Sequence, residues 1–259
     1  ICRPGRPDIP SSIYDWNIRP IKYFSKHNKD NVMKLIGPDF YNISDLLTEE
    51  ELFIQKTAHE FVSNEFKPII NEHFEKGTFP LEIATKLGEL GFMGSALPEE
   101  SGGAGVSNVA YGLILHELER GDSGLRSFAS VQGSLVMYPI HAYGSKEQKE
   151  KWLPGLGAGS LIGCFGLTEP DHGSDPSSMQ TNAKKVKGGF VLSGSKNWIS
   201  NSPIADLFLI WAKDENNIIR GFILEKKESK NIYTPKIEGK FALRASPTGM
   251  IMLDNTFVP

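Results

Sequence analysis

The residues with the clearest chemical potential lie in a short polar stretch, Cys164 to Pro176. A strand is expected to end there in a Thr-Glu-Pro turn, which is followed by a Gly-Ser-Asp loop. Thr168 offers a hydroxyl, Gly173 lets a ligand approach the backbone, and Ser174 can hydrogen-bond to a phosphate or an amide. An ordinary polar loop contains the same residue types. The stretch alone leaves both interpretations open.

A second stretch, Ser193 to Asn201, places an aromatic ring and a hydroxyl near the end of an expected strand. The indole of Trp198 can pack flat against a large aromatic cofactor. Ser200 stands two residues further on, so its side chain is expected on the same face of the strand. Core packing is the alternative role for Trp198.

Residues 44–160 precede both stretches and must help to position them. Their apolar spacing and capping residues are typical of helices. Thr48 and Glu51 form a capping box at the first helix, which Pro68 is expected to interrupt. Residues 125–143 are apolar and low in charge, which predicts a helix buried on most sides. Ser145 caps a further helix that is expected to end at Pro154.

The pattern changes near residue 161 to short runs of β-formers separated by turn signals. The segments 207–212 and 221–224 are predicted to pair as one hairpin. Helices followed by strands, without βαβ alternation, predict an α+β fold with separate domains. We expect an irregular N-terminal extension at 1–43, a helical domain at 44–160 and a β domain at 161–259.

The composition excludes several classes of protein. The chain has 259 residues, 39% hydrophobic content and a formal charge of −3, which does not fit a disordered chain. No apolar run approaches the roughly 18 residues of a membrane span, and the charge balance gives no nucleic-acid footprint. Two cysteines and six scattered histidines predict neither a disulfide framework nor a metal site. Nicotinamide, P-loop and serine-hydrolase motifs are also missing from the sequence.

Together the two stretches resemble the acyl-CoA dehydrogenase family, whose members carry a T-E-P-x-x-G-S-D loop and a G-x-K-x-W-I-[ST]-N strand. Both motifs stand here at the matching spacing. The resemblance runs from about residue 45 to the end of the chain. It implies FAD as the cofactor, a helical N-terminal domain and a β-barrel-like middle domain. It also implies α,β-dehydrogenation of an acyl-CoA thioester.

The resemblance carries the flavin contacts residue by residue. It implies that Thr168 bonds the isoalloxazine ring, that Ser174 also reaches the CoA arm, and that Ser200 lies near the flavin N5 atom. Ser200 replaces the Thr of many members and keeps the hydroxyl. The implied cofactor-binding residues are Phe165, Gly166, Leu167, Thr168, Gly173, Ser174, Trp198, Ile199 and Ser200.

Within the family the chain is most similar to the glutaryl-CoA dehydrogenases, through segments such as 116–120, 134–144 and 241–249. Arg126 is the discriminating residue, because a dicarboxylic substrate carries a free carboxylate that needs a cationic partner. The resemblance assigns Arg126 to this carboxylate, with Ser127 helping and Glu119 nearby. The implied reaction is oxidative decarboxylation of glutaryl-CoA to crotonyl-CoA. A short-chain acyl-CoA dehydrogenase or oxidase is the alternative.

The family also has a C-terminal helical domain, which carries the catalytic Glu and much of a homotetramer interface. We expect no counterpart of that domain before Pro259, so no residue is assigned as catalytic base, and a non-catalytic fragment is a further alternative. The resemblance implies electron-transferring flavoprotein as a partner. It also implies the mitochondrial matrix for a eukaryotic source and the cytoplasm otherwise.

Overall fold

The computed structural model describes residues 41–259. The expected extension at residues 1–43 lies almost wholly outside this range. The helical elements are η2 (Ile43–Leu46), α1 (Glu49–Phe61), η3 (Val62–Phe66), α2 (Lys67–Lys76), α3 (Glu82–Glu89), η4 (Glu99–Ser101), α4 (Asn108–Gly121), α5 (Ser123–Ser130), η5 (Val131–Met137), α6 (Tyr138–Tyr143), α7 (Lys146–Gly157) and η6 (Pro176–Ser178). The strands are β1 (Gly163–Gly166), β2 (Asn182–Val186), β3 (Gly189–Ser200), β4 (Leu207–Lys213), β5 (Ile219–Glu225), β6 (Ile232–Tyr233) and β7 (Thr248–Val258).

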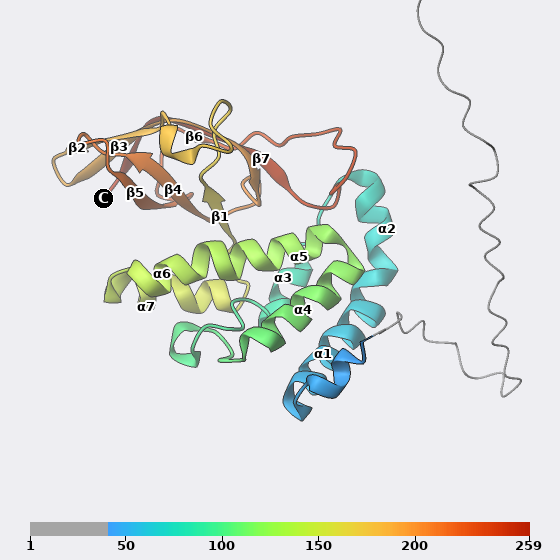
Figure 1. Ribbon diagram of the computed structural model, residues 1–259. Coiled ribbons are helices and arrows are strands. Elements are labelled where there is room, and N and C mark those ends of the chain that lie inside the picture. The colour runs from blue at the N-terminus through green and yellow to red at the C-terminus, as the bar shows by residue number, and fades with distance from the viewer. Residues whose placement is uncertain (1–40) are drawn as a thin grey trace, which may run out of the picture. The chain divides into compact units, whose positions relative to one another are not determined.

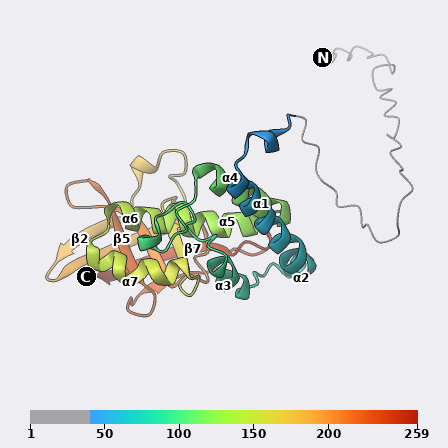
Figure 2. The same ribbon diagram turned by 90° about the horizontal axis from the view of Figure 1, so that it is seen from below.

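The helices and the strands form two layers, so the expected α+β class is confirmed (Figure 1). The sheet follows the order β1-β4-β2-β3-β7-β6, and β5 pairs with β4. The predicted hairpin is present, since Leu207 to Lys213 pair antiparallel with Glu225 to Ile219. Seen from the helical side, the strands lie behind α5, α6 and α7 (Figure 2).

The first helix begins as its sequence predicts. The Thr48 hydroxyl accepts from the Glu51 amide, and the Glu51 carboxylate accepts from the Thr48 amide. Pro68 does not interrupt the chain there, because a π-helical segment, η3, joins α1 to α2 and Pro68 lies in the first turn of α2. The π-helical segment departs from the regular i→i−4 hydrogen bonds, and it is this local change that accommodates a proline without a backbone N–H.

Pro154 does not end its helix either, and α7 continues to Gly157. Near the C-terminal end of a helix, proline removes a single backbone hydrogen bond. Trp152, Leu153 and Leu156 are buried on this turn, and their burial outweighs that loss. The packing of the last turn therefore overrides the local preference of proline.

The long helical stretch α5–η5–α6 supports the sheet. Gly163 at the start of β1 approaches Val136 of η5 so closely that an added Cβ atom would lie 2.6 Å from it. Gln132 of η5 is fully buried, and its amide donates to the carbonyls of Leu156 and Leu161 and accepts from the Gly163 amide. A buried side-chain amide with all these partners fixes the first strand on the helix.

Candidate functional site

The two motif stretches lie side by side in the fold. The segment after β1 carries Thr168, and its carbonyl accepts from the Asn197 amide of β3 at 2.9 Å. The next residue on β3 is Trp198, so Thr168 and Trp198 border the same place. Sequence spacing alone did not establish this pairing.

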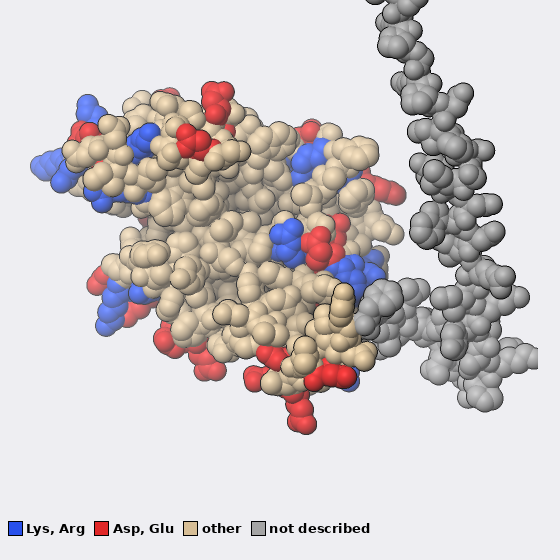
Figure 3. Space-filling view, viewed as in Figure 1, with Lys and Arg blue, Asp and Glu red and all other residues tan. Residues whose placement is uncertain are grey.

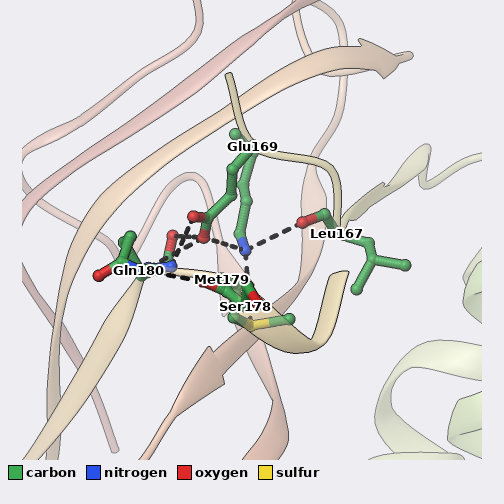
Figure 4. A network of polar contacts seen from close by, with 7 residues as sticks. Leu167, Glu169, Ser178, Met179 and Gln180 are labelled. Atoms are coloured by element: carbon green, nitrogen blue, oxygen red, sulfur yellow. Dashed lines mark hydrogen bonds and ion pairs between the residues drawn. The ribbon is translucent and has the colours of Figure 1, made fainter. Parts of the chain in front are cut away.

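A buried ion pair clamps the two stretches together behind that place (Figure 4). The ammonium of Lys196 donates to the Glu169 carboxylate at 2.9 Å and to the Leu167 carbonyl at 3.1 Å. The same carboxylate accepts from the backbone amides of Gln180 and Thr181 at 2.6 and 2.9 Å. Lys196 is fully buried and Glu169 nearly so. Glu169 therefore has the structural role that the motif implies.

The charge state of Glu169 follows from its partners. Burial raises the pKa of a carboxyl group, but bonds from Gln180, Thr181 and Lys196 outweigh it and lower the pKa of Glu169 to about 2. Burial lowers the pKa of Lys196, which the Glu169 carboxylate opposes. We conclude that the pair is ionised at neutral pH.

The opposite, outward side of the two stretches offers unused hydrogen-bonding groups. Within residues 41–259 the hydroxyls of Thr168, Ser174 and Ser200 have no hydrogen-bond partner in the chain. Trp198 has a left-handed backbone, with φ of 58°, and its side chain is 61% exposed. An exposed indole and free hydroxyls on the same two stretches fit a large aromatic ligand with polar ring edges.

The remaining predicted cofactor residues fall into two groups. Phe165 and Leu167 are half-buried, and Gly173 is exposed with open space where a Cβ atom would stand. Gly166 and Ile199 are buried, and Ile199 packs in the core of the β layer. Ile199 and Gly166 can therefore meet a ligand only through their backbones, whereas Phe165, Leu167 and Gly173 have accessible surface.

The predicted carboxylate-binding residues lie at the junction of α4 and α5. Asp122 ends α4 and caps α5 by accepting from the Gly124 amide at 2.7 Å. The Arg126 Nε atom donates to the Glu119 carboxylate at 2.8 Å, and Ser123 also donates to it. These two bonds lower the pKa of Glu119. Structure and sequence therefore agree that Glu119 and Arg126 are neighbours.

Much of the Arg126 guanidinium remains available for a ligand. The side chain is 37% exposed, and its Nη atoms have no hydrogen-bond partner among residues 41–259. Ser127 follows it on α5 and is half-buried. The surface in Figure 3 is mostly uncharged and is hollowed between the strands and the helices, with opposite charges grouped over the α4–α5 junction.

A loop of the β layer connects this junction to the Trp198 region. Gly124 of α5 lies against the backbone of Ala245 and Ser246. Two residues further on, the Pro247 carbonyl accepts from the Asn201 amide at 2.6 Å, and Thr248 pairs with Ser200 in the sheet. The 245–248 loop thus links the helix of Arg126 to the strand end of Ser200.

Two groups that the sequence did not single out build this site. The sequence did not indicate that Lys196 is buried, because a lysine in a strand usually extends into solvent. The role of Gln132 was missed because it lies in an apolar run. Its polarity was the available signal, since a side-chain amide in a buried stretch needs hydrogen-bond partners. Among residues 41–259, no cluster of His, Cys, Asp or Glu could hold a metal ion, and no helix is long and apolar enough to cross a bilayer.

Comparison with known proteins decides the family. The model of the acyl-CoA dehydrogenase N-terminal domain matches residues 48–160, and that of the middle domain matches residues 164–256. The chain belongs to the acyl-CoA dehydrogenase family. Its helical layer and its β layer are thus the N-terminal and middle parts known for this family.

Relatives and solved structures place the chain near more than one member of the acyl-CoA dehydrogenase family. Glutaryl-CoA dehydrogenase of Desulfococcus multivorans is 36% identical over 220 residues, which cover 82% of this chain and 56% of that protein. The mitochondrial short-chain specific acyl-CoA dehydrogenase of Bos taurus is 33% identical, with 82% and 52% covered. The chain spans about half the length of these curated relatives.

A solved structure gives a similar result. The glutaryl-CoA dehydrogenase of Mycobacterium smegmatis in complex with FADH2 aligns with a TM-score of 0.82 and 45% identity. The alignment covers 85% of this chain and 56% of that one.

Proposed function

We propose that this chain is part of an FAD-dependent acyl-CoA dehydrogenase whose substrate is glutaryl-CoA. We further propose that residues 44–160 and 161–259 are its N-terminal and middle domains. The observation that carries the substrate proposal is the Arg126 side chain, whose Nε atom Glu119 holds and whose Nη atoms have no partner among residues 41–259. The similarity of the chain to two glutaryl-CoA dehydrogenases, at 36% and 45% identity, supports it.

The free groups around Trp198 suit FAD as the cofactor. Bound FAD would supply the hydride acceptor for the β-carbon of the acyl chain. Thr168 and Ser200 would hold the ring edge by their hydroxyls, Ser174 would bond the phosphates or the CoA arm, and Trp198 would cover the ring. These groups are held in position before the ligand binds, because the buried Glu169–Lys196 pair fixes both stretches relative to each other.

Arg126 and Ser127 would bind the free carboxylate at the far end of glutaryl-CoA. The guanidinium offers a fork of N–H donors that matches a carboxylate with two parallel bonds. Glu119 fixes the fork through the Nε atom and leaves the Nη atoms for the ligand. Binding this carboxylate sets which carbons reach the flavin, and the same carboxylate is the group lost as CO2.

The chain's own contribution to catalysis is positioning, and we assign no catalytic base among its residues. By family resemblance we propose that a C-terminal helical domain supplies the base and that the whole enzyme is a homotetramer. Electron-transferring flavoprotein would accept the electrons. The compartment would be the mitochondrial matrix in a eukaryote and the cytoplasm otherwise.

Substrate choice can be tested by Arg126→Ala in the enzyme that carries this chain. We expect kcat/KM for glutaryl-CoA to fall at least tenfold, since a charge-assisted bond contributes about 1.5–3 kcal/mol. Butyryl-CoA has no free carboxylate, so its turnover should change little. Arg220→Ala serves as the control, because Arg220 pairs with Asp214 in the β4–β5 hairpin.

The outcome also distinguishes a glutaryl-CoA dehydrogenase from the second candidate, a short-chain acyl-CoA dehydrogenase. The bovine short-chain enzyme is nearly as similar to this chain as the glutaryl-CoA relative is. Preference of the unaltered enzyme for butyryl-CoA, with glutaryl-CoA activity indifferent to Arg126→Ala, would identify a short-chain enzyme. A chain that binds neither thioester and no FAD would be a non-catalytic product.

A further inference from the structure

We propose that Lys196 is a positioning residue for the flavin: its buried ammonium orients the Leu167–Thr168 peptide so that the Thr168 amide faces the cofactor. The inference rests on the proposed FAD site. It assigns a task to a lysine that makes no contact with the ligand itself.

The orientation follows from the planarity of the peptide bond. Lys196 donates to the Leu167 carbonyl oxygen at 3.1 Å, and that carbonyl therefore points toward the interior. In a trans peptide the N–H of the next residue points the opposite way, so the Thr168 amide points outward. Within residues 41–259 this amide has no acceptor in the chain.

The neighbouring backbone groups already have hydrogen-bond partners among residues 41–259, whereas the Thr168 amide has none. The Thr168 carbonyl accepts from Asn197, and the Glu169 amide donates to the His172 carbonyl at 3.2 Å. Together with the Thr168 hydroxyl, which has no partner among residues 41–259, the amide gives two adjacent donors on one residue. Two donors on one residue suit the carbonyl and nitrogen acceptors along the edge of a flavin ring.

Packing alone does not account for a charge at this position. The Lys196 side chain is fully buried among strands, a place where an apolar side chain of similar length would pack without a desolvation cost. An ammonium, by contrast, can donate several hydrogen bonds at once. Here it joins the Leu167 carbonyl to the Glu169 carboxylate, and Figure 4 shows dashed lines from one nitrogen to both of these labelled residues.

The test is a titration of the apo form of the enzyme that carries this chain with FAD, followed by flavin fluorescence and by the visible absorption of the bound flavin. Lys196→Met keeps the length of the side chain and removes the donor. We expect the Kd for FAD to rise at least tenfold, with a changed fine structure of the visible band. Glu225→Gln is the matched control, because Glu225 is another buried acid with a lysine partner, Lys151, away from the motif. It should lower the thermal midpoint but change the Kd less than twofold.

A double variant distinguishes positioning from stability. Lys196→Met leaves Glu169 buried without its counter-charge, whereas Lys196→Met combined with Glu169→Gln leaves a neutral pair. We expect the double variant to regain thermal stability but not FAD affinity. If Lys196→Met does not fold, FAD binding is compared between the double variant and the unaltered protein. Recovery of FAD affinity together with stability would overturn the inference.

The unaltered chain separates this inference from the function on which it rests. Saturable FAD binding by the unaltered enzyme, with equal binding by the double variant, would overturn the role of Lys196 alone. A folded unaltered enzyme that binds no FAD would overturn the proposed cofactor site and the inference with it.

Discussion

At the scale of single residues, the site divides into groups that face a ligand and groups that hold them. The resemblance of the two motifs indicated the first kind, which comprises Thr168, Ser174, Trp198 and Ser200. The second kind depends on contacts between distant segments. Lys196 lies 27 residues from Glu169 in the sequence, and only the closed β layer shows that they meet.

The low pKa of Glu169 predicts a pH dependence of stability. The folded pKa is about 2 against an ordinary value of 4.5, so the unfolded chain binds more protons between these values. Stability from this group is full above pH 4.5 and is lost as the pH falls toward 2, by roughly 3 kcal/mol. Urea midpoints between pH 6 and pH 3 should fall more steeply for the unaltered chain than for Glu169→Gln. The exposed Glu89→Gln serves as control, and an equal slope for all three would contradict the prediction.

At the scale of elements, the sequence predicted where helices begin better than how they continue. Caps at Thr48 and Ser145 depend on neighbouring residues and were readable. The π-helical segments η3 and η5 were not, because an extra residue in a turn is stabilised by packing against other elements. In η5, Gly133 approaches the backbone of Gly94, a contact that no local pattern encodes.

Two glycine substitutions test the packing of these helices. At Gly133 a Cβ atom would lie 2.8 Å from the Gly94 nitrogen, so Gly133→Ala should force the helix from the 94–97 turn. We expect a loss of about 1–3 kcal/mol in unfolding free energy. Gly112→Ala on α4 meets nothing within 4 Å and should gain up to about 1 kcal/mol from helix propensity. Urea unfolding of both variants measures these changes. An unchanged free energy of unfolding for Gly133→Ala would contradict the close contact.

At the scale of the molecule, the two layers share their interior. The core of the helices includes Leu207 of β4 and Ala245 of the loop before β7, whereas Cys164, Phe208 and Ile251 belong to the core of the β layer. The sequence indicated separate domains, since the change from helical to strand patterns near residue 161 is sharp. The shared core could not be read from it, because the side chains that cross the boundary are ordinary apolar residues.

The shared interior predicts that both layers unfold together, and a pair of tryptophans can test this. Trp152 of α7 donates its indole N–H at 2.7 Å to the buried Glu225 of β5, whereas the buried Trp211 N–H has no partner among residues 41–259. Both Trp→Phe changes remove similar area, but only Trp152→Phe leaves a buried carboxylate short of a donor. It should therefore cost about 1–3 kcal/mol more than Trp211→Phe. Far-UV circular dichroism and fluorescence should report one shared transition, which Trp152→Phe shifts as a whole. Two transitions, with only one shifted, would show that the layers unfold independently.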